Sequence, residues 1–157
     1  MSDVYEELRA RALAVTRDDL APEGRDSPVL GVIMDLAYPE GTATVVGLAD
    51  GTTSLYHSGG GGMIGGGEHA QVAEATRRWV ATAADLAESL ELAEDYPLPT
   101  GPGRVQLVVL TPGGRRRAEV ADEELGSGGH PLSPLFLSGH DVITQLRLVD
   151  EATPGGG

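Results

Sequence analysis

The chain contains no cysteine, no lysine and no asparagine among its 157 residues. Because it lacks cysteine, it cannot form a disulfide, a thiolate metal site, an iron–sulfur cluster or a cysteine nucleophile. Because all 11 basic residues are arginine, a P-loop lysine, a Schiff-base lysine and a lysine general base are excluded as well. These absences remove several large classes of enzyme before any pattern in the sequence is considered.

Positive charge is also scarce, with 11 basic residues against 24 acidic residues and a net charge of −13. Nucleic acids and anionic membrane surfaces attract proteins through a positive field, so neither is an expected partner. The first residues are acidic where a signal peptide is positively charged. No apolar run approaches the ~20 residues that span a bilayer. We therefore expect a cytoplasmic protein.

The residues that are present suffice for one globular domain. Hydrophobic residues make up 40% of the chain, and the length fits a single unit of ordinary size. We expect residues 1–150 to form this domain and the glycine-rich residues 151–157 to be a disordered tail.

The clearest local signal is a strand at residues 29–38. Its even positions from 30 to 36 are all apolar, whereas its odd positions form a weaker face that includes Asp35. One strong face and one weak face predict an antiparallel sheet that is covered mainly on one side. We interpret Asp35 as a solvated residue or as a residue at a subunit contact.

Turn signals divide the rest of the N-terminal half. A helix over residues 2–20 precedes this strand, and strands over 42–48 and 52–57, joined at Asp50-Gly51, follow it. A long helix is predicted from residue 68 to about residue 95. About 27 helical residues would reach ~40 Å, so a bend or an early end is expected. The buried stripe predicted for the N-terminal helix consists of Val4, Leu8, Ala12 and Val15.

In the C-terminal half, strands at 104–110 and 115–120 form a predicted hairpin. The three adjacent arginines in its second strand indicate an edge that is protected from pairing with another chain. An acidic, glycine-rich loop follows over 122–129. A short helical turn then precedes a helix that begins near residues 140–141, after a break at Ser138-Gly139.

These elements predict an α+β fold. Its antiparallel sheet consists of a three-strand meander and a hairpin, and the long central helix and the N- and C-terminal helices pack on it. Trp79 lies on the apolar stripe of the long helix, so it is expected to be buried against the strand at 29–38.

Residues 59–67 contain seven glycines in nine positions, between a predicted strand and the long helix. Holding so many glycines rigid costs backbone entropy. Either the backbone there approaches another surface closely, or the loop is mobile and orders when a partner arrives. Met63 and Ile64 at the centre favour a flap with an apolar tip. A G-x-G-x-x-G match is also present, but no parallel βαβ unit accompanies it.

His57 and His69 flank this segment, and Arg77 follows on the long helix. Together with backbone N–H groups at the helix N-terminus, they could bind a small molecule or a phosphate group. Lone histidines at the ends of elements usually contact backbone instead, and no two histidines have metal-ligand spacing on a helix. We expect no metal, no cofactor and no catalytic residue. The candidate ligand- or partner-binding residues are Met63, Ile64, His57, His69 and Arg77.

An acidic run closes the predicted long helix, where it opposes the helix dipole. We interpret this run as a solvated face, with a docking surface for a basic partner as the alternative. Its members are Glu88, Glu91, Glu94 and Asp95.

The order helix, meander, long helix, hairpin, helix over residues 2–149 resembles the small profilin-like α/β domains, including the roadblock/LC7 and longin families. The chain departs from their usual order, with three strands before the central helix and two after it. The resemblance implies a non-catalytic scaffold that dimerises and binds partner proteins, often small GTPases. No family motif is matched, so no functional residue is transferred.

Two functions follow as hypotheses. The first is a non-enzymatic, homo-oligomeric protein-interaction domain, a homodimer that pairs through the weaker face of its sheet. The second is a small-molecule or phosphate-binding protein, which could be an enzyme, that uses residues 59–67 and the flanking histidines.

Overall fold

The computed structural model describes the backbone of residues 3–152 and the side chains of these residues other than 63, 64 and 152. The helices are α1 (Asp3–Leu13), α2 (Ala70–Leu86), α3 (Asp122–Gly126) and α4 (Ser133–Ala152). The strands are β1 (Gly31–Tyr38), β2 (Gly41–Leu48), β3 (Thr53–His57), β4 (Gly62–Ile64), β5 (Glu91–Ala93), β6 (Arg104–Thr111) and β7 (Gly114–Ala121). Short 3₁₀ helices are η1 (Arg17–Asp19), η2 (Pro22–Gly24), η3 (Gly66–Glu68) and η4 (Ala87–Ser89). Of the predicted tail, residues 153–157 lie outside the described residues.

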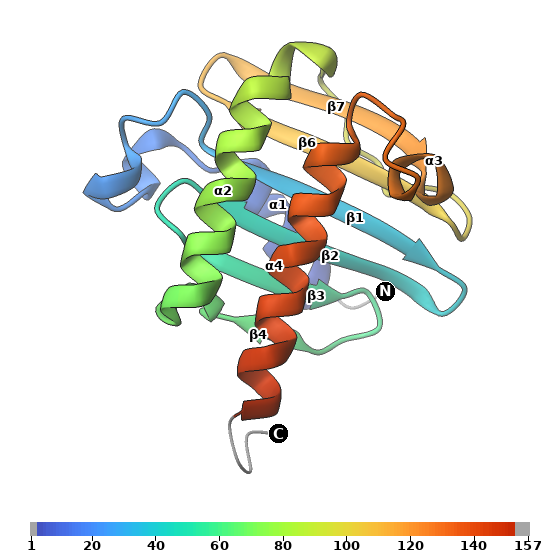
Figure 1. The fold of residues 1–157 in the computed structure, drawn as a ribbon, viewed down its shortest axis with the longest axis horizontal. Helices are drawn as coiled ribbons and strands as arrows, with labels where there is room; N and C mark the ends of the chain where they lie inside the picture. Colours follow the sequence, from blue (N-terminus) through green and yellow to red (C-terminus); the bar gives the residue numbers. More distant parts are fainter. Residues whose placement is uncertain (1–2, 153–157) are drawn as a thin grey trace.

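The strands form one antiparallel sheet in the order β4-β3-β2-β1-β6-β7-β5. Figure 1 shows α2 and α4 side by side in front of this sheet and α1 behind it. The predicted α+β fold, with helices packed on an antiparallel sheet, is confirmed. The sheet has two more strands than predicted, because β4 and β5 are three-residue strands without a readable sequence period.

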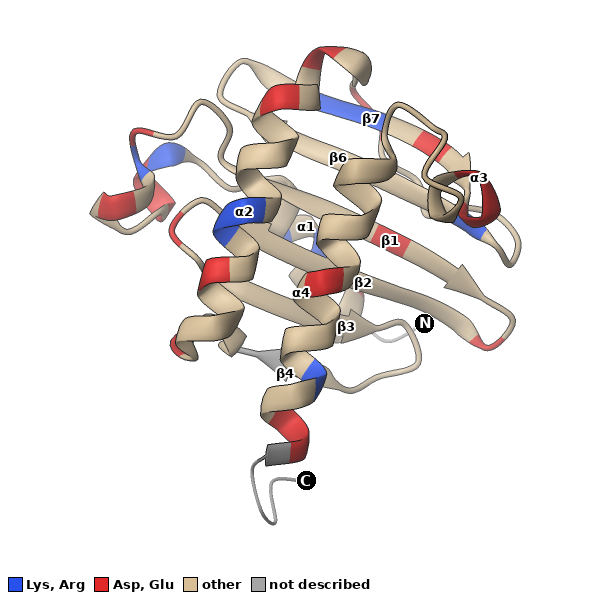
Figure 2. Cartoon of the chain, viewed as in Figure 1, with Lys and Arg blue, Asp and Glu red and all other residues tan. Residues whose placement is uncertain are grey.

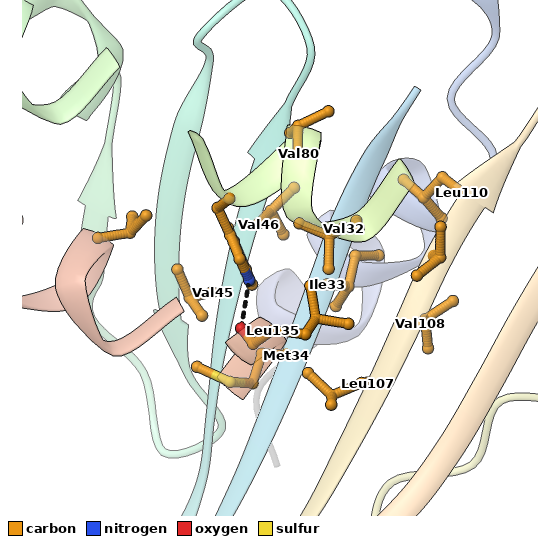
Figure 3. Close-up of a cluster of buried hydrophobic side chains, with 14 of the residues drawn as sticks. Val32, Ile33, Met34, Val45, Val46, Val80, Leu107, Val108, Leu110 and Leu135 are labelled. Atoms are coloured by element: carbon orange, nitrogen blue, oxygen red, sulfur yellow. Dashed lines mark hydrogen bonds between the residues drawn. The ribbon is translucent and has the colours of Figure 1, made fainter. Parts of the chain in front are cut away.

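The face of the sheet under α2 and α4 holds the main hydrophobic core, drawn in Figure 3. Val32 and Met34 of β1 lie on this face and are fully buried. Trp79 of α2 is fully buried in the same cluster, as predicted. Its indole N–H donates to the Leu135 carbonyl oxygen of α4 at 2.9 Å. This bond satisfies the one polar atom of the largest core side chain and joins the two helices.

Close approach between α4 and the core explains why Gly139 lies inside a helix. A Cβ at Gly139 would lie 2.7 Å from the Met34 Cε and 3.0 Å from the Trp79 ring. The predicted break at Ser138-Gly139 is therefore wrong, because α4 runs without interruption through both residues. Gly139 lowers the helix propensity of α4, but its lack of a Cβ allows α4 to contact Trp79.

The opposite face of the sheet carries a row of polar side chains that are cross-strand neighbours. Thr44, Asp35, Gln106 and Glu119 follow one another in register across β2, β1, β6 and β7. We call these four residues the polar row. Asp35 is fully buried, so the interpretation of this residue as solvated or as a subunit contact is wrong. Its carboxylate accepts hydrogen bonds from the Thr44 hydroxyl at 2.6 Å and from the Gln106 amide at 3.0 Å.

Helix α1 lies over the polar row and pairs with it. The Arg9 guanidinium binds the Asp35 carboxylate through two bonds, of 3.1 and 2.8 Å. The Tyr5 hydroxyl lies 2.5 Å from the Thr44 hydroxyl. Of the predicted stripe, Ala12 and Val15 are buried and Leu8 packs against the core, whereas Val4 is 64% exposed and Tyr5 is buried in its place. Because α1 covers this face, the physical reason given for a homodimer, an uncovered second face, is wrong.

Two helices end earlier than their sequence windows. Helix α1 stops at Leu13 instead of residue 20, because the Thr16 N–H and hydroxyl both donate to the Asp19 carboxylate and begin η1. Helix α2 stops at Leu86 and is followed by η4 and β5, which confirms the early end expected from its length. Among the described helices, none has the length and the apolar character that crossing a bilayer requires.

Replacing Trp79 with alanine is expected to lower the free energy of unfolding by about 3–5 kcal/mol, because it opens a large cavity between α2, α4 and β1. Urea denaturation followed by circular dichroism measures this loss. Leu148→Ala serves as the control, since Leu148 is 48% exposed on α4, and its expected effect is within about 0.5 kcal/mol. A Trp79→Ala variant as stable as this control would contradict the packing described above.

Replacing Arg9 with methionine is expected to cost about 3–5 kcal/mol, because the buried Asp35 carboxylate loses its counter-charge. The matched variant is Arg11→Met on the same helix, where the guanidinium is 74% exposed and paired with the exposed Glu7. That exposed pair is expected to contribute less than about 0.5 kcal/mol. Equal midpoints of urea unfolding for the two variants would show that the buried pair does not hold α1 in place.

Candidate functional site

The glycine-rich segment at residues 59–67 forms an edge strand in place of the predicted flap. Gly62–Ile64 is β4, which pairs with β3 from Ser54 to Tyr56. The backbone of Met63 and Ile64 thus belongs to a strand, while their side chains lie outside the described part of the structure. Whether this segment moves when a partner binds stays a prediction. Whether these two residues bind a partner stays a prediction.

Close backbone approach, the other cause considered for these glycines, applies at two positions. A Cβ at Gly62, which has φ +143°, would lie 2.0 Å from the Leu55 carbonyl oxygen. A Cβ at Gly67 would lie 2.2 Å from the Gly51 carbonyl oxygen. No side chain fits at such distances, so these glycines let β4 and η3 pass directly against β3 and the turn before it.

Gly62→Ala is expected to destabilise the fold by about 2 kcal/mol or more, because both its positive φ and its contact with Leu55 resist a Cβ. Gly59→Ala is the control in the same segment, since nothing lies within 4 Å of its Cβ position. That variant is expected to stay within about 0.5 kcal/mol of the parent protein in thermal or urea unfolding. Similar losses for both variants would contradict the close-approach explanation.

The structure separates the two histidines that flank this segment. His57 ends β3 and lines a hollow of about 340 Å³ together with Tyr38 and Ser58. His69 is the N-cap residue of α2, and this end of α2 adjoins the opposite end of β3. Five residues of strand lie between these ends, a distance of about 13 Å. His57 and His69 therefore do not form one site.

Arg77 lies at the same end of β3 as His69, and its Nη2 is 3.4 Å from the Asp50 carbonyl oxygen. It does not line the hollow beside His57. Among the described residues, no group of three or more His, Asp or Glu side chains is placed to hold a metal ion. Binding of a small molecule or a phosphate group by these residues stays a prediction.

Another hollow, of about 440 Å³, lies between the end of β1 and α4 and is lined by Tyr38, Phe136 and His140. Burial raises the pKa of the Tyr38 hydroxyl, and Asp122 and Glu40 add to the shift. Burial lowers the pKa of the His140 imidazole, against the opposing effect of Asp122. Both groups are therefore neutral at pH 7, and the hollow offers them as uncharged polar contacts.

A further hollow follows the margin of the sheet at β7, the uppermost labelled strand in Figure 1. β5 pairs only with the arginine segment of β7, from Arg115 to Arg117. Residues 118–121 pair with β6 on one side, and in the described part of the chain no strand lies on their other side. We call residues 118–121 the open edge. Some of its backbone N–H and C=O groups point away from β6.

The open edge runs along a groove of about 1000 Å³, which we call the edge groove. The exposed Leu92 of β5, with 65% of its surface accessible, lies on its border. The residues that line it are 89, 91–95, 104, 117–120 and 130–132. The groove therefore combines unpaired strand backbone with an accessible apolar side chain.

Two arginines in the edge groove are already bound within the chain. Arg104 Nε lies 3.2 Å from the Glu119 carboxylate. Arg117 Nε donates to the Gln106 side-chain oxygen at 2.6 Å, and its Nη2 lies 4.0 Å from Glu119. The polar row thus ends inside the groove, at Glu119. These contacts fix the arginine heads and neutralise much of their charge.

The other arginines of β7 fasten neighbouring segments to the sheet. Arg115 donates to the carbonyl oxygens of Leu13, the last residue of α1, and of Val15, just after it. Arg116 donates to the Leu90 carbonyl oxygen, just before β5. The interpretation of these arginines as protection for an open edge is wrong, because β5 covers this part of β7 and the side chains bind the chain itself.

No protein-family model matches the chain, and neither a curated protein nor a solved structure shows significant similarity to it. The resemblance to the roadblock/LC7 and longin families therefore rests on element order alone. The edge groove was not predicted from the sequence, because the three residues of β5 are too few to show the alternation of a strand. The signal that pointed toward it was the acidic run that includes Glu91, Glu94 and Asp95.

Proposed function

We propose that this chain is a non-enzymatic protein-interaction domain that takes an extended segment of another protein into the edge groove. The open edge of β7 carries the proposal. Its backbone groups lack a neighbouring strand, and an added strand satisfies such groups by continuing the ladder. Four extended residues span about 10 Å from the first Cα to the last, so a short peptide is long enough to cover the open edge.

The surroundings of the open edge support binding by an extended chain. The edge groove, of about 1000 Å³, has room for the side chains of such a segment. Leu92, opposite Arg116 of β7, offers an accessible apolar contact on the border of the groove, and apolar contact of this kind contributes affinity that hydrogen bonds alone do not.

Three of the charged side chains that line the groove, Arg104, Arg117 and Glu119, are engaged within the chain, which favours a structural role over catalysis for these three. A general acid or base must reach the substrate with a free proton donor or acceptor. Arg104 and Glu119 bind each other, and Arg117 binds Gln106. Their main role is thus to hold the shape of the groove.

A second copy of the chain is a weaker candidate for this surface than a different protein. Two copies meeting at the edge groove would bring their acidic borders together, in a chain of net charge −13. The predicted homodimer stays a prediction, and sedimentation velocity at micromolar concentration tests it.

A library of random 12-residue peptides, displayed on phage and selected on the purified protein, tests the proposal. The selected peptides are synthesised, and their affinities are measured by fluorescence anisotropy. Leu92→Ala is expected to weaken binding by about tenfold, because it removes an accessible apolar contact from the border of the edge groove. Hydrogen exchange is expected to slow at the backbone amides of residues 118–121 when peptide is present.

Leu148→Ala is the matched control, since Leu148 is also an exposed leucine but lies on α4 and does not line the groove. Its affinity for the peptides is expected to equal that of the parent protein. A library that yields no enriched peptide, or peptides that protect amides elsewhere, would overturn the proposal. A dimer that Leu92→Ala dissociates would make a second copy the occupant.

A further inference from the structure

Around the open edge, the arginine side chains have partners within the chain, whereas several carboxylates form no ion pair with a described residue. The arginines inside the edge groove have partners, because Arg104 binds Glu119 and Arg117 binds Gln106. Among the described residues, Glu91, Glu94 and Asp95 of the groove border form no ion pair within 4 Å. The positive charges are thus used within the chain, while these carboxylates are available to an incoming partner.

A second set of acidic side chains lies at the other end of the open edge. Residue 121 leads directly into α3, whose first three residues are Asp122, Glu123 and Glu124. These side chains are exposed, and they too form no ion pair among the described residues. Figure 2 shows the acidic α3 at the far end of β7 from its blue arginine segment.

We infer that the occupant of the edge groove is an extended basic segment of another protein, with Arg or Lys side chains near both ends of the stretch that pairs with residues 118–121. This inference rests on the proposed function and specifies the partner's chemistry. The backbone ladder selects an extended conformation. The carboxylates at the two ends select positive charge and disfavour an acidic segment, which would meet like charges.

The spacing between the two acidic sets limits the occupant further. The open edge of four residues is about 10 Å long, so basic residues about four or five positions apart reach just beyond both of its ends in an extended chain, toward both sets. Alternate side chains of such a segment point to opposite faces of the sheet. One group meets Val120 and Leu132 on the α4 side, and the other meets Glu119 on the α1 side.

The test repeats the peptide selection on two triple variants that change the net charge equally. The first, Glu91→Gln/Glu94→Gln/Asp95→Asn, neutralises the groove border. The second, Asp18→Asn/Glu23→Gln/Asp26→Asn, neutralises exposed carboxylates that do not line the groove. Peptides selected on the parent protein and on the second variant are expected to be enriched in Arg and Lys relative to the unselected library.

Peptides selected on the groove-border variant are expected to lose this enrichment, and the basic peptides are expected to bind it about tenfold more weakly. Replacing the basic residues of a selected peptide with Gln is expected to weaken its binding to the parent protein to a similar degree. Added salt is also expected to lower the affinity of the basic peptides for the parent protein, because it screens the attraction between exposed charges.

The failure of this inference differs from the failure of the proposed function. Selected peptides that protect the amides of residues 118–121 but carry no excess of Arg or Lys would overturn the basic partner and leave strand addition in place. Equal weakening by both triple variants would show that net charge alone acts, and would overturn the role of the groove border. A selection without any enriched peptide would overturn both.

Discussion

The buried ion pair between Arg9 and Asp35 is the interaction on which the arrangement of this molecule depends. Asp35 is fully buried in the central strand β1, where an unpaired carboxylate would be strongly unfavourable. Arg9 supplies the counter-charge through two bonds. Because α1 buries few apolar residues, chiefly Tyr5 and Ala12, this pair rather than hydrophobic area positions the helix. With α1 in place both faces of the sheet are covered, and unpaired backbone remains at its margin beside β7.

The hydrogen bonds that extend from the Arg9–Asp35 pair join the centre of the sheet to the edge groove. Gln106 lies at the centre of this network, since its amide donates to Asp35 and to the Pro97 carbonyl oxygen while its side-chain oxygen accepts from Arg117. No buried side-chain nitrogen or oxygen among the described residues lacks a hydrogen-bond partner. A network satisfied in this way is rigid. It therefore fixes Arg117 and Glu119 at the open edge and keeps their charges engaged with each other.

The arginines of β7 show how a local charge pattern can indicate the wrong partner. Three consecutive arginines read alone indicate a positive surface, yet Arg115 and Arg116 donate to backbone carbonyl oxygens and Arg117 donates to Gln106. The hydrogen bonds of Arg115 and Arg116 hold the end of α1 and the start of β5 against the sheet. Glu91, Glu94 and Asp95 on the groove border form no ion pair with any described residue, so the field at the groove border is negative. Charge complementarity at a surface depends on which charges remain unpaired after folding.

The sequence by itself determined the fold class, the central strands and the burial of Trp79. These rest on local periods, since β1 alternates over eight residues and α2 repeats an apolar stripe over 17. The tertiary structure alone decided the rest. Arg9 and Asp35 are 26 positions apart in the chain, and Gly139 is helical because Met34 and Trp79 lie against it. The open edge exists because β5 begins only at Glu91, opposite Arg117, and covers three of the eight residues of β7. Each of these features depends on which distant segments meet, and no local period records such contacts.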